Sequence, residues 1–183
     1  LAVVLDEGIY NLSLVLNEKQ NRLTIDRGYE TMVELLVQML APFDIDFTSG
    51  EIVGSYCPGR YDLSVSGKKF AGISQRRIRG GVSIQTYLCV EGSGAERAKV
   101  VKEFYERAGK CETDRYPTIQ PETMASLSEL AGKTITTAHL DDQLDNVLGR
   151  FGKIEHADLT KHEESRFNLY YERVQARNKK ALA

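Results

Sequence analysis

Residues 54–77 read GSYCPGRYDLSVSGKKFAGISQRR, and this stretch decides the fold. Apolar and polar side chains alternate over residues 61–66, which is typical of a β-strand with one buried face. Gly67 supplies a turn, and residues 70–74 predict a second strand that returns beside the first. We therefore expect a β-hairpin with a cysteine, Cys57, just before its first strand and two lysines in its turn.

Further strands are predicted on both sides of the hairpin. Residues 82–90 alternate in the same way, residues 9–16 predict another strand, and the apolar run at residues 1–5 predicts a buried one. Helical periodicity appears over residues 24–40, 95–108, 121–130, 137–148 and 160–178, with caps expected at Thr24, Thr137 and Thr160. In the last helix we expect a buried face of Phe167, Tyr170, Tyr171 and Val174. This order predicts an α+β fold with an antiparallel or mixed sheet and packed helices.

Size and composition narrow the class of protein. A chain of 183 residues is long enough for one domain with a core, and its net charge of −2 does not favour a nucleic-acid or membrane-surface partner. No apolar run approaches the roughly 18 residues of a spanning helix. Three cysteines without C-x-x-C spacing favour reduced thiols. We therefore expect a cytoplasmic protein without a metal site.

The chain starts at Leu1 on an apolar run, whereas protein termini are usually polar and frayed. We therefore expect residues 1–183 to be the C-terminal portion of a single domain. On this hypothesis an N-terminal segment, and part of any active site with it, is missing from the sequence.

Cys57 is the first candidate for chemistry. Pro58 favours an extended conformation at Cys57, and Gly59 allows a sharp turn, so the loop can present the thiol. Reactivity requires the thiolate, which nearby cations such as Lys69 or Arg60 would favour. Read from these residues alone, a structural cysteine in a turn is the more common case. Cys89 lies inside an apolar strand and is predicted to be a small core residue.

The basic residues of the hairpin are the second candidate. Lysines in hairpin turns are commonly exposed, but the neighbouring Ala71 and Gly72 would let a ligand approach closely. The basic side chains form either a solvated face or a docking surface for an acidic protein or a phosphate: Lys68, Lys69, Arg76, Arg77 and Arg79.

Taken together, these motifs resemble the biotin/lipoate protein ligase superfamily, specifically its lipoate-attaching cofactor transferases. Residues 67–76 are similar to the lysine motif of that family, and residues 1–14 are similar to the strand pair that follows its arginine and double-glycine motif. Within the family, residues 56–63 are most similar to the octanoyltransferases that take octanoate from the glycine cleavage H protein and pass it to lipoyl domains. The arginine and double-glycine motif itself is not among these residues.

The resemblance implies an amidotransferase with the catalytic-domain fold of that superfamily. Cys57 would attack the octanoyl-lysine amide of the H protein, and a lysine on a lipoyl domain of a 2-oxoacid dehydrogenase E2 subunit would attack the resulting thioester. Lys69 would hold the acyl carbonyl oxygen and stabilise the oxyanion. The octanoyl or lipoyl group is substrate, and no cofactor is implied. Substrate-binding positions implied by the match are Tyr56, Gly59, Asp62, Val65, Phe70, Ala71, Gly72 and Gln75, with Val65, Phe70 and Ala71 along an acyl tunnel that Gly72 keeps open.

Two alternatives remain at this point. An ATP-dependent lipoate–protein ligase of the same fold would use Lys69 and need no cysteine, so Cys57 favours the transferase. A non-catalytic protein that binds lipoyl domains would instead use the exposed basic side chains of Lys68, Arg76, Arg77 and Arg79.

Overall fold

The sheet formed by the residues that the structure describes has five strands in the order β1-β5-β4-β3-β2, and every neighbouring pair is antiparallel. This computed structural model describes residues 2–18, 22–108 and 118–182. The strands are β1 (Ile9–Asn17), β2 (Thr48–Ser49), β3 (Asp62–Val65), β4 (Lys68–Ile78) and β5 (Gly81–Cys89). The predicted α+β class, with an antiparallel sheet and packed helices, is confirmed.

Among the residues described, five α-helices and two short 3-10 turns accompany the strands. Their bounds are α1 (Ile25–Leu40), η1 (Ala41–Phe43), α2 (Gly94–Ala108), η2 (Pro121–Thr123), α3 (Leu127–Ala131), α4 (Thr137–Leu148) and α5 (Lys161–Leu182). The single helix predicted over residues 121–130 is wrong, because Met124 is extended between η2 and α3 and bridges to Lys69 of β4. Thr24 caps α1 as predicted, whereas the cap of α4 is Thr136 rather than Thr137.

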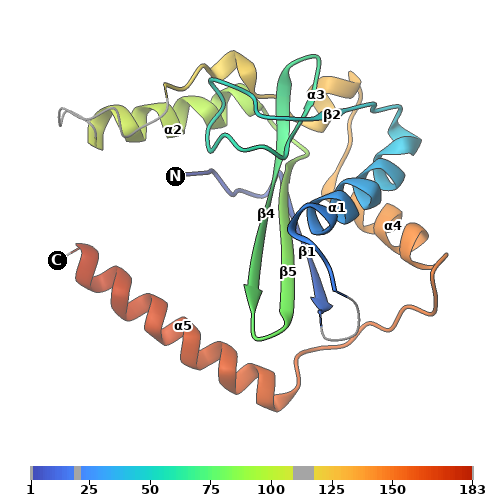
Figure 1. The fold of residues 1–183 in the computed structure, drawn as a ribbon. Helices are drawn as coiled ribbons and strands as arrows, with labels where there is room; N and C mark the ends of the chain where they lie inside the picture. The colour runs from blue at the N-terminus through green and yellow to red at the C-terminus, as the bar shows by residue number, and fades with distance from the viewer. Residues whose placement is uncertain (1, 19–21, 109–117, 183) are drawn as a thin grey trace. The chain divides into compact units, whose positions relative to one another are not determined.

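Two hydrophobic cores form on opposite faces of the sheet. Helices α1 and α4 cover one face, and α2 lies on the other side (Figure 1). The first core joins the sheet to α1, α3 and α4 through residues such as Leu36, Phe70 and Leu140. The second core joins Tyr56 and Cys89 to α2, where Ala98, Val101 and Tyr105 are buried. The hairpin therefore contributes to the first core, and the loop before it contributes Tyr56 to the second.

The predicted strand at residues 1–5 is wrong for the residues described. Residues 2–6 form no ladder, Val3 and Leu5 are exposed, and only Ala2 and Val4 pack against the second core. The carbonyl of Gly8 accepts from the backbone N–H groups of Val90 and Glu91, where β5 has just ended. Among the described residues, no strand pairs with the segment before Gly8.

The chain divides into two compact units, residues 1–150 and 151–183. The second contains α5, which begins after Thr160; the Thr160 hydroxyl accepts from the backbone N–H of Glu163, as the capping prediction requires. The side chains predicted to form the buried face of α5 are instead 43–58% exposed: Phe167, Tyr170, Tyr171 and Val174. In the described parts of the chain, we find no helix with the length and hydropathy of a membrane span.

Candidate active site

A β-bulge in the hairpin decides where Lys69 points. The turn itself is Ser66-Gly67, whose φ angles of 50° and 76° suit a tight two-residue hairpin. Pairing changes from Leu63 with Ala71 to Ser64 with Lys69, so Phe70 is an extra residue on β4. A one-residue shift moves the following side chains to the opposite face. Phe70 and Ala71 therefore both enter the first core, and Lys69 lies on the second face.

The prediction that Lys69 is an exposed turn residue is wrong. Lys69 belongs to β4, and its side chain is 0% exposed. Its Nζ lies 2.8 Å from Oδ1 of Asp62, whose side chain is 2% exposed. Asp62 faces the same side because it pairs with Gly72 across the ladder. The two charges can remain buried because each compensates the other.

Asp62 also anchors the loop that carries the cysteine. Its Oδ2 accepts hydrogen bonds from the backbone N–H groups of Gly59 at 3.1 Å and Ile52 at 3.2 Å. Both carboxylate oxygens are thus engaged within the protein. Gly59 and Asp62, which the resemblance placed among the substrate-binding residues, lie in the site and shape this loop.

Lys69 completes the anchoring from the other side. Its Nζ donates to the backbone carbonyls of Tyr56 at 3.0 Å and Cys57 at 2.9 Å, and lies 3.4 Å from Ser55 Oγ. The two carbonyls and Asp62 account for the three N–H donors of an ammonium group. The structure therefore joins Lys69 directly to the backbone of Cys57.

Cys57 is not extended, contrary to the prediction from Pro58. Its φ of 48° is in the left-handed region, which costs a non-glycine residue roughly 1–2 kcal/mol. The hydrogen bond from Lys69 to its carbonyl holds the peptide in this orientation and overrides the local preference. The thiol is free and partly exposed, as expected of a loop that presents it.

The wall beside Cys57 is built by aromatic residues. Tyr56 is fully buried, its hydroxyl lies 3.5 Å from Cys89 Sγ, and its ring stacks against that of Tyr87. Burial raises the pKa of the Tyr56 phenol and of the Cys89 thiol. Cys89 is 0% exposed, so its predicted role as a core residue is confirmed.

Gly72 makes room for Tyr87, a residue that the sequence reasoning missed. A Cβ at Gly72 would lie 3.2 Å from Cε1 of the Tyr87 ring. The Tyr87 hydroxyl is buried and has no hydrogen-bond partner among the described residues. The pairing of a tyrosine with a glycine across adjacent strands, Tyr87 with Gly72, is the pattern that could have drawn attention to it.

Other predicted site residues lie elsewhere. Phe70 and Ala71 are fully buried in the first core, and Val65 packs against the same core. The Gln75 side-chain amide donates to the carbonyl of Ile25 at 2.6 Å and so links β4 to α1. These four residues do not join the group around Lys69.

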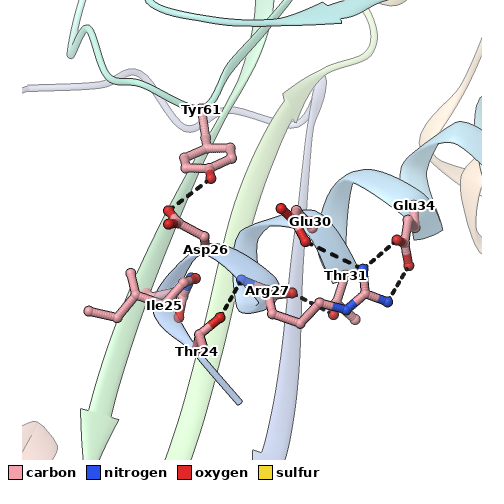
Figure 2. A network of polar contacts seen from close by, with 9 residues as sticks. Thr24, Ile25, Asp26, Arg27, Glu30, Thr31, Glu34 and Tyr61 are labelled. Carbon is pink, nitrogen blue, oxygen red and sulfur yellow. Dashed lines mark hydrogen bonds and ion pairs between the residues drawn. The ribbon is translucent and has the colours of Figure 1, made fainter.

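Arg60 and Tyr61, which follow the cysteine loop, bind α1. Figure 2 shows the Tyr61 hydroxyl directed at Asp26, to which it donates at 3.2 Å. Arg60 pairs with the same carboxylate at 3.3 Å, and the Tyr61 ring stacks on Tyr29 with centroids 4.1 Å apart. Arg60 is therefore bound to α1 and is not the cation beside the thiol that the sequence suggested as one possibility.

The basic residues of the hairpin do not form one continuous exposed surface. Lys68, Arg76 and Arg79 are exposed. Arg77 turns inward, where its guanidinium donates to the carbonyls of Leu23 and Thr24 and pairs with Glu18.

Comparison with known proteins identifies the family. Residues 1–149 match the family described as "Lipoyl protein ligase A/B catalytic domain". The chain belongs to this family. The family resemblance read from residues 54–77 is thus confirmed.

Among curated proteins, this lipoyl ligase A/B-family chain is 52% identical to an octanoyl-GcvH:protein N-octanoyltransferase of Anoxybacillus flavithermus and 49% identical to one of Geobacillus kaustophilus. It is 43% identical to a lipoyl-GcvH:protein N-lipoyltransferase of Listeria monocytogenes. Each match covers 100% of this chain but only 65–66% of the relative. The chain thus spans just under two thirds of the length of these relatives.

Solved structures share the fold. The crystal structure of a lipoate-protein ligase A bound with ATP aligns with a TM-score of 0.66 at 17% identity, over 89% of this chain and 60% of that one. A bipartite lipoate protein ligase from Thermoplasma acidophilum aligns with a TM-score of 0.61 at 18% identity, over 89% and 59%. The predicted catalytic-domain fold of the lipoate ligases is thereby confirmed.

Proposed function

We propose that this chain carries the cysteine of an octanoyltransferase that works through a thioester. The observation that carries the proposal is the partly exposed Cys57, in a strained loop whose backbone is bonded to a fully buried lysine. The relatives named as octanoyltransferases support the same activity. An ATP-dependent ligase would give the thiol no role.

The proposed reaction has two steps. In the first, the Cys57 thiolate attacks the carbonyl carbon of an octanoyl-lysine amide, and a tetrahedral oxyanion forms. The C–N bond then breaks, the lysine amine leaves with the proton that the Cys57 thiol gave up, and the acyl group remains on sulfur. In the second step the neutral amine of an acceptor lysine attacks the thioester, the C–S bond breaks, and the proton lost by the amine returns to the Cys57 thiolate. A thiolate suits both steps because it is a good nucleophile and a good leaving group.

Lys69 supports the first step through its charge. Its ammonium is 2.9 Å from the carbonyl oxygen of Cys57 and is fixed there by Asp62. A buried cation near the reacting carbonyl lowers the energy of the oxyanion. We propose that Lys69 exchanges one of its backbone hydrogen bonds for the acyl oxygen.

The acyl chain is better placed on the second face of the sheet than along the predicted tunnel. Phe70 and Ala71 are 0% exposed within the first core, so a chain beside them would have to displace that core. Gly72 faces Asp62 and Tyr87 on the Cys57 side. Cys57 is partly exposed, so we propose that the acyl chain lies on the exposed side of Cys57, and that Val65 and Gln75 contribute indirectly.

The names of the relatives suggest the partners. We propose the octanoylated glycine cleavage H protein as donor and the lipoyl domains of 2-oxoacid dehydrogenase E2 subunits as acceptors, in the cytoplasm and without a cofactor. The Listeria relative is named as a lipoyltransferase, so a lipoyl donor is the alternative substrate to test.

The test uses the complete protein and octanoylated H protein, without ATP. We expect intact-mass and peptide analysis to show an octanoyl group on Cys57 that is absent in Cys57→Ala and is removed by adding a lipoyl domain. Acyl transfer from free octanoate that requires ATP, with no adduct on Cys57, would instead establish a ligase. Cys57→Ser that retains full transfer would also contradict the proposal.

A further inference from the structure

The hydroxyl of Tyr87 is a buried donor with no partner among the described residues. Leaving a buried hydroxyl unpaired is unfavourable, and most such groups in folded proteins are hydrogen-bonded. An unpaired one in a native structure therefore requires a reason. Its position beside the cysteine loop supplies one.

Tyr87 lies on the face of β5 that carries the site. It pairs with Gly72 across the ladder, and a Cβ built on Gly72 would have the Tyr87 hydroxyl at 3.5 Å and Asp62 Oδ1 at 3.6 Å. Both oxygens therefore lie close to Gly72, on the same face of the sheet. Asp62 Oδ1 is in turn 2.8 Å from Lys69 Nζ, which bonds the carbonyl of Cys57.

The ring and the hydroxyl of Tyr87 have different surroundings. The ring stacks on Tyr56, and Tyr87 and Cys57 both pack against the second core. Burial is the main cause that raises the pKa of the Tyr87 phenol well above its usual value. Smaller contributions in the same direction come from the nearby Tyr56, Cys89, Asp62 and Cys57. The hydroxyl therefore keeps its proton at neutral pH and is available only as a neutral donor or acceptor.

We propose that the Tyr87 hydroxyl donates a hydrogen bond to the carbonyl oxygen of the acyl group as that group is transferred to Cys57. The inference rests on the proposed function in one respect, that Cys57 accepts an acyl group. Tyr87 would then be a second donor at the oxyanion, beside the charge of Lys69. Since no described residue bonds this hydroxyl, we assign its partner to the substrate.

The test compares two reactions of Cys57 in the complete protein. With p-nitrophenyl octanoate, the thiolate attacks a carbonyl, an oxyanion forms, and p-nitrophenolate leaves as the thioester forms. With iodoacetamide, the thiolate displaces iodide at a saturated carbon, and no oxyanion forms. We expect Tyr87→Phe to slow acylation about 100-fold, as loss of one oxyanion donor does, and to leave alkylation unchanged.

Tyr10→Phe is the matched control, because Tyr10 lies on the neighbouring strand β1 and its hydroxyl donates to Asp141 at 2.7 Å. Both reactions should keep their wild-type rates in this variant. Tyr87→Phe should unfold at no lower denaturant concentration than wild type, because no residue that the structure describes bonds the hydroxyl that it removes.

Equal acylation of wild type and Tyr87→Phe would overturn the inference, and so would a parallel loss of acylation and alkylation. No acylation of wild-type Cys57 by the ester would overturn it as well. Tyr87-dependent acylation by the ester, with no adduct from octanoylated H protein, would support Tyr87 and refute the proposed donor. The two proposals therefore fail on different observations.

Discussion

Asp62 and Lys69 form an ion pair in which both side chains are buried. Because neither charge is solvated by water, each is stabilised in the folded protein by the other. Asp62→Asn keeps the shape but leaves a buried ammonium without its counter-charge. We expect this variant to lower the free energy of unfolding by about 3 kcal/mol, measured by urea denaturation. Glu96→Gln removes an exposed pair with Lys99 and should change it by less than about 1 kcal/mol.

The same pair can be tested by a double-mutant cycle. Adding Lys69→Met to Asp62→Asn removes the orphan charge, so the double variant should be more stable than the sum of the two single changes predicts. Simple additivity would show that the charges do not stabilise each other. Either way, the cycle separates the structural role of Lys69 from its proposed role in acyl transfer.

Gly72 is required for the packing of the Tyr87 ring. In Gly72→Ala the new methyl group would lie 3.2 Å from the Tyr87 ring and would force that ring to move. We expect a loss of about 1–3 kcal/mol in the free energy of unfolding, typical of overpacking. Gly50→Ala is the control, since nothing lies within 4 Å of the position that its Cβ would take. Equal stability of the two variants would argue against close packing of Tyr87 on Gly72.

At the level of elements, the start of α1 holds the segment that follows the cysteine loop. Thr24 Oγ1 accepts from the backbone N–H of Arg27 at 3.1 Å, and Asp26 in the first turn binds Tyr61 (Figure 2). Thr24→Ala should lower the free energy of unfolding by about 1 kcal/mol, because it removes the cap. Thr24→Ser keeps the oxygen and should stay close to wild type; thermal or urea denaturation distinguishes the two. Equal losses would show that the cap contributes nothing.

Periodicity predicted the elements that are long and have one buried face. Alternation identified β5, where Val82, Ile84 and Leu88 are buried, and helical spacing with Thr24 as cap identified α1. It failed at residues 1–5, because an apolar run does not reveal whether a neighbouring strand is present to pair with it. It also failed at residues 121–130, where pairing of Met124 with Lys69 outweighs local helix preference.

The site was predictable in its residues more than in its geometry. Cys57 and Lys69 followed from the motif, but the burial of Lys69 depends on the bulge at Phe70. A single extra residue in one strand leaves no mark in the alternation of side chains. Tyr87 was missed for a related reason. It stands out because its buried hydroxyl has no hydrogen-bond partner among the described residues, and only the three-dimensional structure shows this.

At the scale of the whole first unit, Asp6 and Arg97 join the segment before β1 to helix α2. Asp6 Oδ1 lies 2.7 Å from Nη2 of Arg97, and a second bond runs from Nε to Oδ2 at 2.9 Å. The hydrogen bonds from Arg97 lower the pKa of Asp6 below its ordinary value of 3.8. A carboxylate with a lowered folded-state pKa stabilises the protein above its unfolded pKa, and this stabilisation is lost as the pH falls through the folded value.

We therefore expect wild type to be more stable than Asp6→Asn at neutral pH, and the difference to shrink as the pH falls below 3.8. Denaturant unfolding of both proteins between pH 7 and pH 2 measures this difference. Arg97→Met should remove the same pH dependence although it keeps the carboxylate, because the Arg97 hydrogen bonds are the largest cause of the lowered pKa. If the difference in stability between wild type and Asp6→Asn stays constant with pH, Asp6 stabilises the contact with Arg97 through packing and neutral hydrogen bonds rather than through its charge.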